Sequence, residues 1–338
     1  MAWPIFRPEL PLIEQTLWHP VADSSSVTAQ PSAARLLGQD LVLWRNAAGL
    51  ISAFADQCPH RGARLSLGRV HEGELECPYH GWRFASDGQV SAVPALPQWQ
   101  PPLGHRARRF DAIERYQLIW VRIAPSNLTA PPVFAAEADS HLRKVNCGPY
   151  DVATSAPRIV ENFLDMAHFG FVHDQWLGER ARPEIPDYTL ATSATGFVAS
   201  GCLAWQPRSS IHAQGGAMVE YIYEVNAPYT AILIKVPEQR SVTIEQFRES
   251  IALFVCPIEP ERSRVWFRLA MNDFESNDQT MQQFQDAIFS QDKPVLESQR
   301  PRCLPLAAVA ELHSAADKAS AAYRRYLRDQ SITFGVQP

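Results

Sequence analysis

Residues 58–80 read CPHRGARLSLGRVHEGELECPYH and contain a C-x-H pair, sixteen intervening residues and a C-x-x-H pair. The first pair is Cys58 and His60, and the second is Cys77 and His80. Each pair lies where a short strand is expected to run into a loop, so two loops each carry one thiolate and one imidazole. This donor set predicts a metal centre.

Two kinds of centre use two cysteines and two histidines. Structural zinc sites do so, but zinc fingers usually group cysteine with cysteine and histidine with histidine. Here each loop supplies one residue of each kind, which favours a [2Fe–2S] cluster with both thiolates on one iron and both imidazoles on the other. Gly62 and Gly81 allow tight turns close to such a cluster. The cluster is therefore the preferred interpretation, with zinc as the alternative.

The surrounding segment has the pattern of a small antiparallel β domain. From Trp18 to Ile123, short alternating apolar runs such as ARLLGQDLVLWRN and YQLIWVRIA are separated by turn signals. No helical segment long enough for a parallel βαβ unit lies between them. We expect a first domain over residues 1–125 and a second over 126–338, with a link rich in proline and alanine near 124–137.

The second domain is expected to combine helices with an antiparallel sheet, which makes the whole chain α+β. Residues 158–173 have helical spacing, and long β-branched and aromatic runs between 189 and 270 predict strands. Helical spacing returns over 278–299, where Pro294 is expected to break it, and again over 314–328.

The first predicted helix of this domain carries a second set of metal-binding residue types. Asp165 and His168 are three residues apart and so share a helix face. His173 lies five residues further on, which an ideal helix would turn by about 140°. The helix must therefore end or distort at Gly170 if both imidazoles are to meet one metal. Two histidines and a carboxylate are typical of Fe(II) sites that activate O₂, although two core imidazoles are the plainer alternative.

The identity of the carboxylate is open at this point. Asp165 is either the ligand itself or a hydrogen-bond partner that orients His168. In the second case Asp292 is the candidate, because it follows an amphipathic helix whose apolar residues are expected to pack inward. The alternative is that Asp292 simply caps a helix opened by Pro294.

Composition excludes several classes of partner. The 338 residues carry a formal charge of −5, which gives no basic face for nucleic acid or anionic lipid. No apolar run reaches membrane-spanning length. The stretch MAWPIFRPELPLIEQ lacks the features of a signal peptide, and six cysteines without such a segment suggest a reducing compartment. We expect a cytoplasmic protein.

The two metal patterns together resemble the Rieske non-haem iron oxygenases, and the resemblance extends from Trp18 to Val336. Within that family, AARLLGQDLVLWR and AYRRYLRDQSITFGV resemble hydroxylases of the saxitoxin pathway, SQDKPVLESQRP is similar to caffeine N-demethylases, and the length is like that of dicamba O-demethylase. The resemblance implies a Rieske β domain, a helix-grip catalytic domain and two sets of ligands. These are Cys58, His60, Cys77 and His80 for the cluster, and His168, His173 and Asp292 for a mononuclear Fe(II).

The resemblance also implies roles for two further residues of the same helix. Asp165 would hydrogen-bond both His168 and the partner subunit's His80 in a head-to-tail homotrimer. Asn162 would lie near the iron without binding it.

The expected reaction follows from the two centres. No G-x-G-x-x-G follows a strand, so electrons from NAD(P)H would arrive through a separate reductase or ferredoxin. With O₂ as co-substrate, the enzyme would hydroxylate a C–H bond of a small molecule, or remove an N- or O-methyl group as formaldehyde. The resemblances point to an N-heterocyclic or polycyclic substrate. The alternatives are an aromatic-ring cis-dihydroxylase and a Rieske electron carrier without catalysis.

Overall fold

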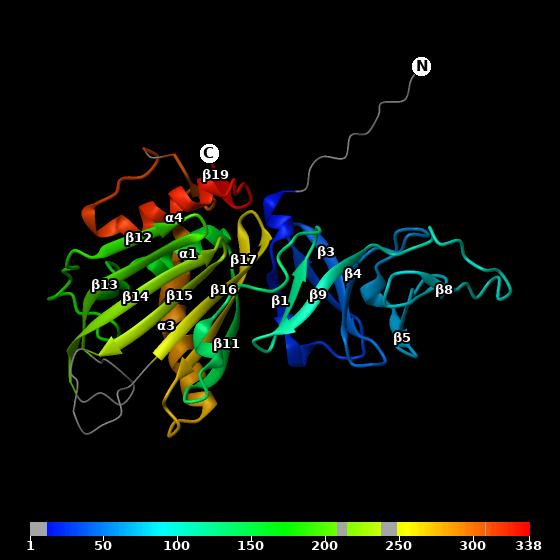
Figure 1. Cartoon of the computed structure of the whole chain (residues 1–338), viewed down its shortest axis with the longest axis horizontal. Helices are drawn as coiled ribbons and strands as arrows, with labels where there is room; N and C mark the ends of the chain where they lie inside the picture. Colours follow the sequence, from blue (N-terminus) through cyan, green and yellow to red (C-terminus); the bar gives the residue numbers. More distant parts are fainter. Residues whose placement is uncertain (1–11, 208–214, 238–248, 308) are drawn as a thin grey trace, which may run out of the picture.

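The computed structural model describes residues 12–207, 215–237, 249–307 and 309–338. The expectation that residues 1–15 form no signal peptide concerns a stretch of which residues 1–11 lie outside these ranges. Two domains lie side by side along the longest axis of the molecule (Figure 1). In the described ranges, no helix is both long enough and apolar enough to cross a membrane.

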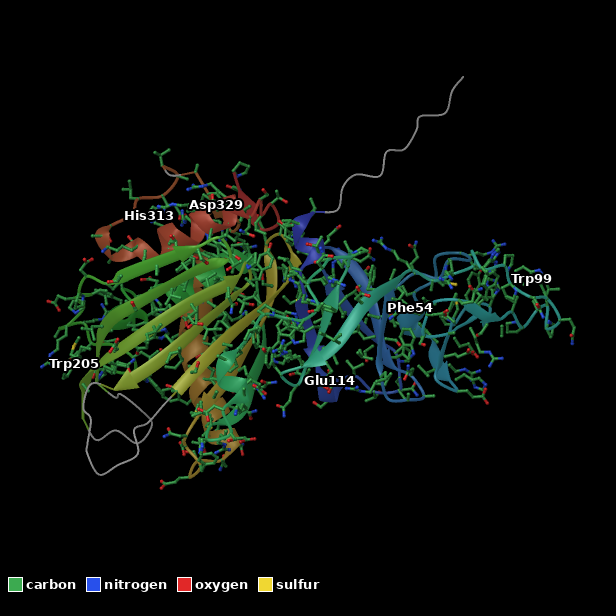
Figure 2. The ribbon with its side chains drawn as sticks, viewed as in Figure 1. Phe54, Trp99, Glu114, Trp205, His313 and Asp329 are labelled. Atoms are coloured by element: carbon green, nitrogen blue, oxygen red, sulfur yellow. The ribbon has the colours of Figure 1, made fainter. Side chains whose placement is uncertain are left out.

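An antiparallel six-stranded sheet forms the body of the first domain, in the order β1-β10-β9-β4-β3-β2. Its strands are β1 (His19–Asp23), β2 (Ser32–Leu36), β3 (Gln39–Arg45), β4 (Ile51–Ala55), β9 (Arg109–Arg115) and β10 (Leu118–Arg122). A four-stranded sheet in the order β5-β6-β7-β8 extends the domain away from the second domain. Its strands are β5 (Arg69–His71), β6 (Glu74–Glu76), β7 (Arg83–Phe84) and β8 (Val90–Ala92). Trp99 lies near the far end of this extension (Figure 2).

Strand β3 shows why the small sheet sits where it does. Side chains alternate between the two faces of a strand. Leu41 and Leu43 join a core shared with the second domain, whereas Val42 and Trp44 join a core that contains Cys58 and Cys77. One strand thus separates the interdomain core from the packing around the candidate cluster.

The second domain is built on a seven-stranded antiparallel sheet in the order β11-β17-β16-β15-β14-β13-β12. The strands are β11 (Arg143–Val152), β12 (Thr189–Ser193), β13 (Gly196–Gln206), β14 (Ala217–Ala227), β15 (Thr230–Pro237), β16 (Glu249–Glu259) and β17 (Arg262–Met271). A short parallel pair, β18 (Leu304–Pro305) and β19 (Val336–Gln337), lies near the C-terminus.

Four helices cover one face of this sheet (Figure 1). They are α1 (Ala156–Leu164), α2 (Phe169–Val172), α3 (Asp278–Ser298) and α4 (Lys318–Asp329). Short 3₁₀ helices occur at η1 (Ile13–Thr16), η2 (Ser24–Ser26), η3 (Leu65–Leu67), η4 (Ala135–Ala138) and η5 (Ala315–Asp317).

The opposite face of the catalytic sheet packs against the first domain. On β16, Leu253 points toward the helices, while Phe254 belongs to the interdomain core together with Trp18, Trp120 and Trp266. The Trp120 and Phe254 rings meet edge to face with centroids 5.0 Å apart. The central strands of the sheet are therefore buried on both faces.

The expected α+β architecture is confirmed, but two helix predictions are wrong. The helix predicted over 158–173 ends at Leu164, because Asp165 adopts extended backbone angles, and a separate turn of helix begins after His168. The break is at Asp165 and not at Gly170. Helix α3 continues through Pro294, so Asp292 lies inside a helix and caps none. Strand β11 was not predicted. The domain boundary near residue 125 stays a prediction.

Candidate metal centres and active site

The two cysteine-histidine loops have the same backbone design. Cys58 follows β4 and Cys77 follows β6. In each loop the cysteine carbonyl accepts a hydrogen bond from the glycine four residues on: Gly62 at 2.8 Å and Gly81 at 3.0 Å. Both glycines have positive φ angles of 73° and 69°, which side chains disfavour. The repeated turn presents one thiol and one imidazole from each loop.

The four side chains associate as two like pairs. The Cys58 and Cys77 thiols interact with each other and are buried. The His60 and His80 rings lie with centroids 4.6 Å apart, and His60 stacks on Trp82 at 4.5 Å. This grouping of sulfur with sulfur and nitrogen with nitrogen fits a binuclear cluster with different ligands on its two irons.

Local chemistry at this site favours bound cations. Burial, together with the neighbouring Cys77, raises the pKa of Cys58 to about 11. Sulfur ligands must be thiolates, so a positive centre is needed to hold them ionised. Among the described residues, Nδ1 of His60 is buried and has no hydrogen-bond partner. Coordination of a metal ion would give this nitrogen a partner.

The second site is assembled from three elements of the catalytic domain. Ser155 caps the start of α1, the helix ends at Asp165, and the turn that follows brings His168 and then His173 to α2. On α3, Asp292 shares the buried face of the helix with Gln285 and Ile288. These positions, separated by three, four and seven residues, point toward the sheet.

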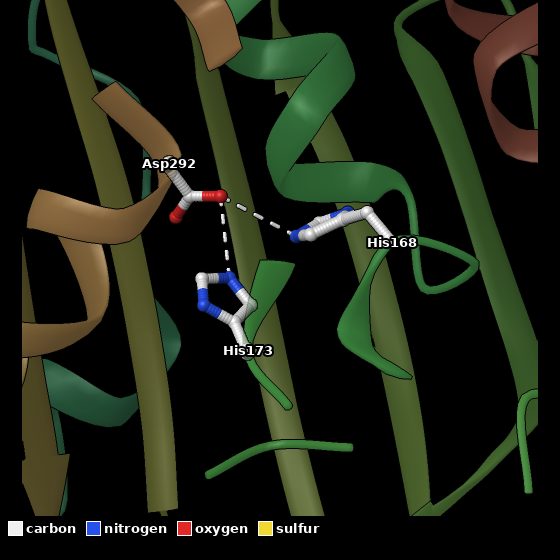
Figure 3. A group of neighbouring side chains, drawn as sticks. All are labelled: His168, His173 and Asp292. Atoms are coloured by element: carbon white, nitrogen blue, oxygen red, sulfur yellow. Dashed lines mark ion pairs between the residues drawn. The ribbon is translucent and has the colours of Figure 1, made fainter. Parts of the chain in front are cut away.

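Oδ1 of Asp292 lies between the two imidazoles (Figure 3). It is 3.4 Å from Nε2 of His168 and 3.2 Å from Nε2 of His173. The three residues offer ligand atoms within 4.8 Å of one another. The Asn162 side-chain amide donates to the same Oδ1 at 3.3 Å, so it approaches the site through the carboxylate.

The outer nitrogen of each imidazole has an oxygen partner. Nδ1 of His168 is 3.3 Å from Oδ2 of Asp165, and Nδ1 of His173 is 2.7 Å from Oε1 of Gln291. These acceptors favour a proton on each Nδ1, which leaves both Nε2 lone pairs facing a carboxylate. A cation between them removes the repulsion, so the donor set fits the 2-His-1-carboxylate arrangement of Fe(II) sites.

A largely apolar cavity adjoins this triad and lies between the helices and the sheet. His168, His173 and Asp292 line it together with aromatic and aliphatic side chains. Tyr221 and Tyr223 are among the aromatic side chains that line the cavity. Phe254 instead belongs to the interdomain core, and Trp176 is partly exposed against Phe284.

The structure thus places every candidate residue, and it adds two that the sequence analysis missed. Asp165 lies beside His168 across a turn, and its side chain is one third exposed. Gln291 and Trp82 were not considered. A residue adjacent to a suspected ligand, as Gln291 is to Asp292, is a reasonable place to look for an orienting partner. Trp82 gave no such signal.

Comparison with known proteins agrees with this geometry. The Rieske [2Fe-2S] domain family matches residues 17–116, and the vanillate O-demethylase oxygenase C-terminal domain family matches residues 152–330, more than half of the chain. The chain is 33% identical to the methylxanthine N1-demethylase NdmA of Pseudomonas putida over 322 residues, covering 92% of this chain and 88% of that protein.

Solved structures show the same fold. NdmA of Pseudomonas putida CBB5 with caffeine has a TM-score of 0.79 and 31% identity, covering 94% of this chain and 90% of that one. Dicamba monooxygenase bound to dicamba, at 21% identity, has a TM-score of 0.77 with 96% and 99% coverage, which shows a common fold. The electron-carrier and zinc alternatives find no support in these relatives. The chain therefore belongs to the Rieske non-haem iron oxygenases, terminal enzymes that pair a [2Fe–2S] cluster with a mononuclear iron and use O₂ and electrons from a partner reductase.

Proposed function

We propose that this oxygenase demethylates a small, neutral N-heterocycle in the cavity beside His168, His173 and Asp292. The proposal rests on one observation: His168, His173 and Asp292, which together can hold a metal ion, line a largely apolar cavity. The overall change is R₂N–CH₃ + O₂ + 2e⁻ + 2H⁺ → R₂N–CH₂OH + H₂O, and the hydroxymethyl product then releases formaldehyde. Similarity to methylxanthine N-demethylases supports this substrate class.

The proposal gives the cluster ligands as Cys58, His60, Cys77 and His80, and the iron ligands as His168, His173 and Asp292. When bound, the iron supplies open coordination positions for O₂, and the cluster supplies single electrons.

The surrounding residues prepare the site for this chemistry. Asp165 and Gln291 hold the Nδ1 protons of the two imidazoles, so both Nε2 atoms face the metal position. Asn162 donates to Asp292 and fixes the carboxylate. Apolar side chains such as Phe163 exclude water from the cavity, which protects a reactive oxidant from side reactions.

The proposal includes a homotrimer in which electrons cross a subunit boundary. Within one chain, the small sheet with the cluster loops and the helices with the triad lie on opposite sides of the six-stranded sheet (Figure 1). His80 is exposed, and the Asp165 side chain is partly exposed. A head-to-tail ring brings such surfaces together, so that Asp165 can accept from the partner subunit's His80 while it orients His168.

Product analysis tests the reaction. The reconstituted enzyme, with a suitable reductase and ¹⁸O₂, is incubated with N-methylated heterocycles, and formaldehyde and the demethylated ring are measured. Equimolar formaldehyde and demethylated product support the proposal, whereas a cis-diol carrying two labelled oxygen atoms would support the dihydroxylase alternative. Analytical ultracentrifugation tests the trimer, and a strictly monomeric active enzyme would exclude the inter-subunit path.

A further inference from the structure

A buried ion pair interrupts the apolar wall of the cavity. Lys235 and Glu249 are directly opposed on β15 and β16, and both line the cavity that holds the iron triad. Nζ of Lys235 lies 3.5 Å from Oε2 of Glu249. Their side chains are only 7% and 15% exposed.

The strand register makes this pair part of a row of four residues that crosses the sheet. Tyr221, Lys235, Glu249 and Met271 are successive cross-strand partners on β14 to β17, and all four line the cavity. A second row lies on the same face, two residues further along each strand. It consists of Tyr223, Leu233, Ile251 and Leu269. The sheet thus offers a ligand two opposite charges beside an otherwise largely hydrocarbon surface.

Neither member of the pair has its hydrogen-bonding capacity filled by the other. Charge-assisted hydrogen bonds between ammonium and carboxylate usually span about 2.7–2.9 Å, and 3.5 Å is longer. An ammonium has three donors, and a carboxylate has several acceptor positions. In the described part of the chain, Glu249 is the one acceptor that Lys235 contacts. Packing alone does not require such a pair, because buried ion pairs often stabilise no better than apolar residues of similar volume.

We infer that Lys235 and Glu249 are specificity-determining residues that recognise a ring N–H next to a carbonyl group on the substrate. The carbonyl oxygen accepts from the Lys235 ammonium, and the neighbouring N–H donates to the Glu249 carboxylate. The inference deepens the proposed function and rests on it, because it places a lactam- or imide-type edge of an N-heterocycle in the cavity of the iron triad.

The charges of the pair also predict what the cavity rejects. The pair is neutral overall, so a neutral ligand leaves the charge balance of the cavity unchanged. An aromatic carboxylate would meet Lys235 favourably but would place its own charge beside Glu249, and like charges brought together in a poorly solvated site are strongly disfavoured. The pair therefore selects against carboxylic acids of similar size.

Anaerobic calorimetry on the iron-loaded holoenzyme tests this without turnover. Three probes are compared: theobromine, which has a ring N–H between two carbonyls; caffeine, in which a methyl group replaces that hydrogen; and vanillate, an aromatic carboxylate. We expect theobromine to bind about tenfold more tightly than caffeine, since one charge-assisted hydrogen bond is lost, and vanillate to bind most weakly. Equal affinities for theobromine and caffeine, or no binding of theobromine, would overturn the inference.

Variants separate recognition from simple support of the fold. Glu249→Gln keeps the side-chain shape but leaves Lys235 unpaired, so vanillate should gain about tenfold in affinity while the preference for theobromine shrinks to within about threefold. Lys235→Met should weaken theobromine binding by about tenfold.

A matched control is Lys318→Met, which removes another lysine paired with a carboxylate, Asp187, outside the cavity lining. It should leave all three affinities unchanged. A Glu249→Gln protein that loses affinity equally for all three probes would show a structural role and contradict the inference. Because formaldehyde release is measured separately, failure of the ligand preference and failure of demethylation are distinguishable.

Discussion

Gln291→Leu removes the acceptor that holds the Nδ1 proton of His173, at a position where water cannot replace it. The hydrogen bond is 2.7 Å long, and the His173 side chain is 2% exposed. In the metal-free protein the imidazole can move its proton to Nε2, where Asp292 accepts it. Iron binding requires Nε2, so the proton must then sit unpaired on a buried Nδ1. The cost of the substitution therefore falls on the metal-bound state.

The size of this effect follows from the burial. A buried donor without a partner costs about 1–3 kcal/mol, and each 1.4 kcal/mol is about tenfold in an equilibrium constant. We expect the affinity for the mononuclear iron to fall by about tenfold to a hundredfold, as is usual when a partner of a metal-binding histidine is removed. Gln291→Glu retains an acceptor and should keep the affinity within about threefold of the parent.

Competition with a coloured Fe(II) chelator measures the affinity, while the visible spectrum of the cluster reports on the first domain. Gln283→Leu is the matched control, because Gln283 lies on the same helix but is exposed. If the Gln291→Leu protein held its iron as tightly as the control, the orienting role of Gln291 would be refuted.

Four further outcomes are expected. Cys58→Ser should abolish the visible absorption of the cluster and leave the mononuclear iron bound, because the two centres lie in different domains; stoichiometric zinc in the colourless parent would contradict this. Asp292→Ala should lower the mononuclear iron content more than Asp165→Asn does. Metal analysis that showed the reverse would mean that Asp165, and not Asp292, is the carboxylate ligand. Asp165→Asn should keep the cluster spectrum and the trimer but slow reoxidation of the reduced cluster, with substrate and O₂ present, by orders of magnitude; reoxidation at the parental rate would exclude the bridge. Burial lowers the pKa of His19 to about 4 from 6.5. Between pH 6.5 and 4, His19 is therefore protonated in the unfolded chain but neutral in the folded chain, which favours unfolding as the pH falls. The free energy of unfolding should decrease by up to about 3 kcal/mol between pH 6.5 and 4, and urea titrations of His19→Gln should show a shallower dependence.

The sequence predicted most of the architecture because its signals were local. Alternating apolar runs identified most of the long strands, although not β9 or β11, and ligand spacing drew attention to both metal sites. The end of α1 is a local feature that the sequence nevertheless predicted wrongly. Helical spacing continues past Asp165, yet the backbone turns there, and Asp165 accepts from the Ala167 amide at 2.7 Å. An aspartate can hydrogen-bond the backbone of the next turn instead of continuing a helix, and spacing does not reveal which it does.

Long-range geometry was beyond the sequence. Helix α3 continues through Pro294, although local rules predict a break there. The position of Asp292 beside His168 and His173 depends on how this helix packs within the domain. The opposition of Lys235 and Glu249 depends on the register of β15 with β16, and a shift of one residue would have placed the two side chains on opposite faces of the sheet. Charged residues near the ends of two predicted strands gave no means of choosing that register.

The core shared by the two domains limits how this protein can be divided. Trp120 of the first domain and Phe254 of the second are both fully buried, and Tyr116 stacks on Phe254 with ring centroids 5.3 Å apart. Cutting the link between the domains would turn an aromatic face of each half to water, and large exposed apolar faces promote association. The cluster-bearing half is thus no detachable module. A related chain that lost its catalytic half would need polar substitutions on this face before it could serve as a free electron carrier.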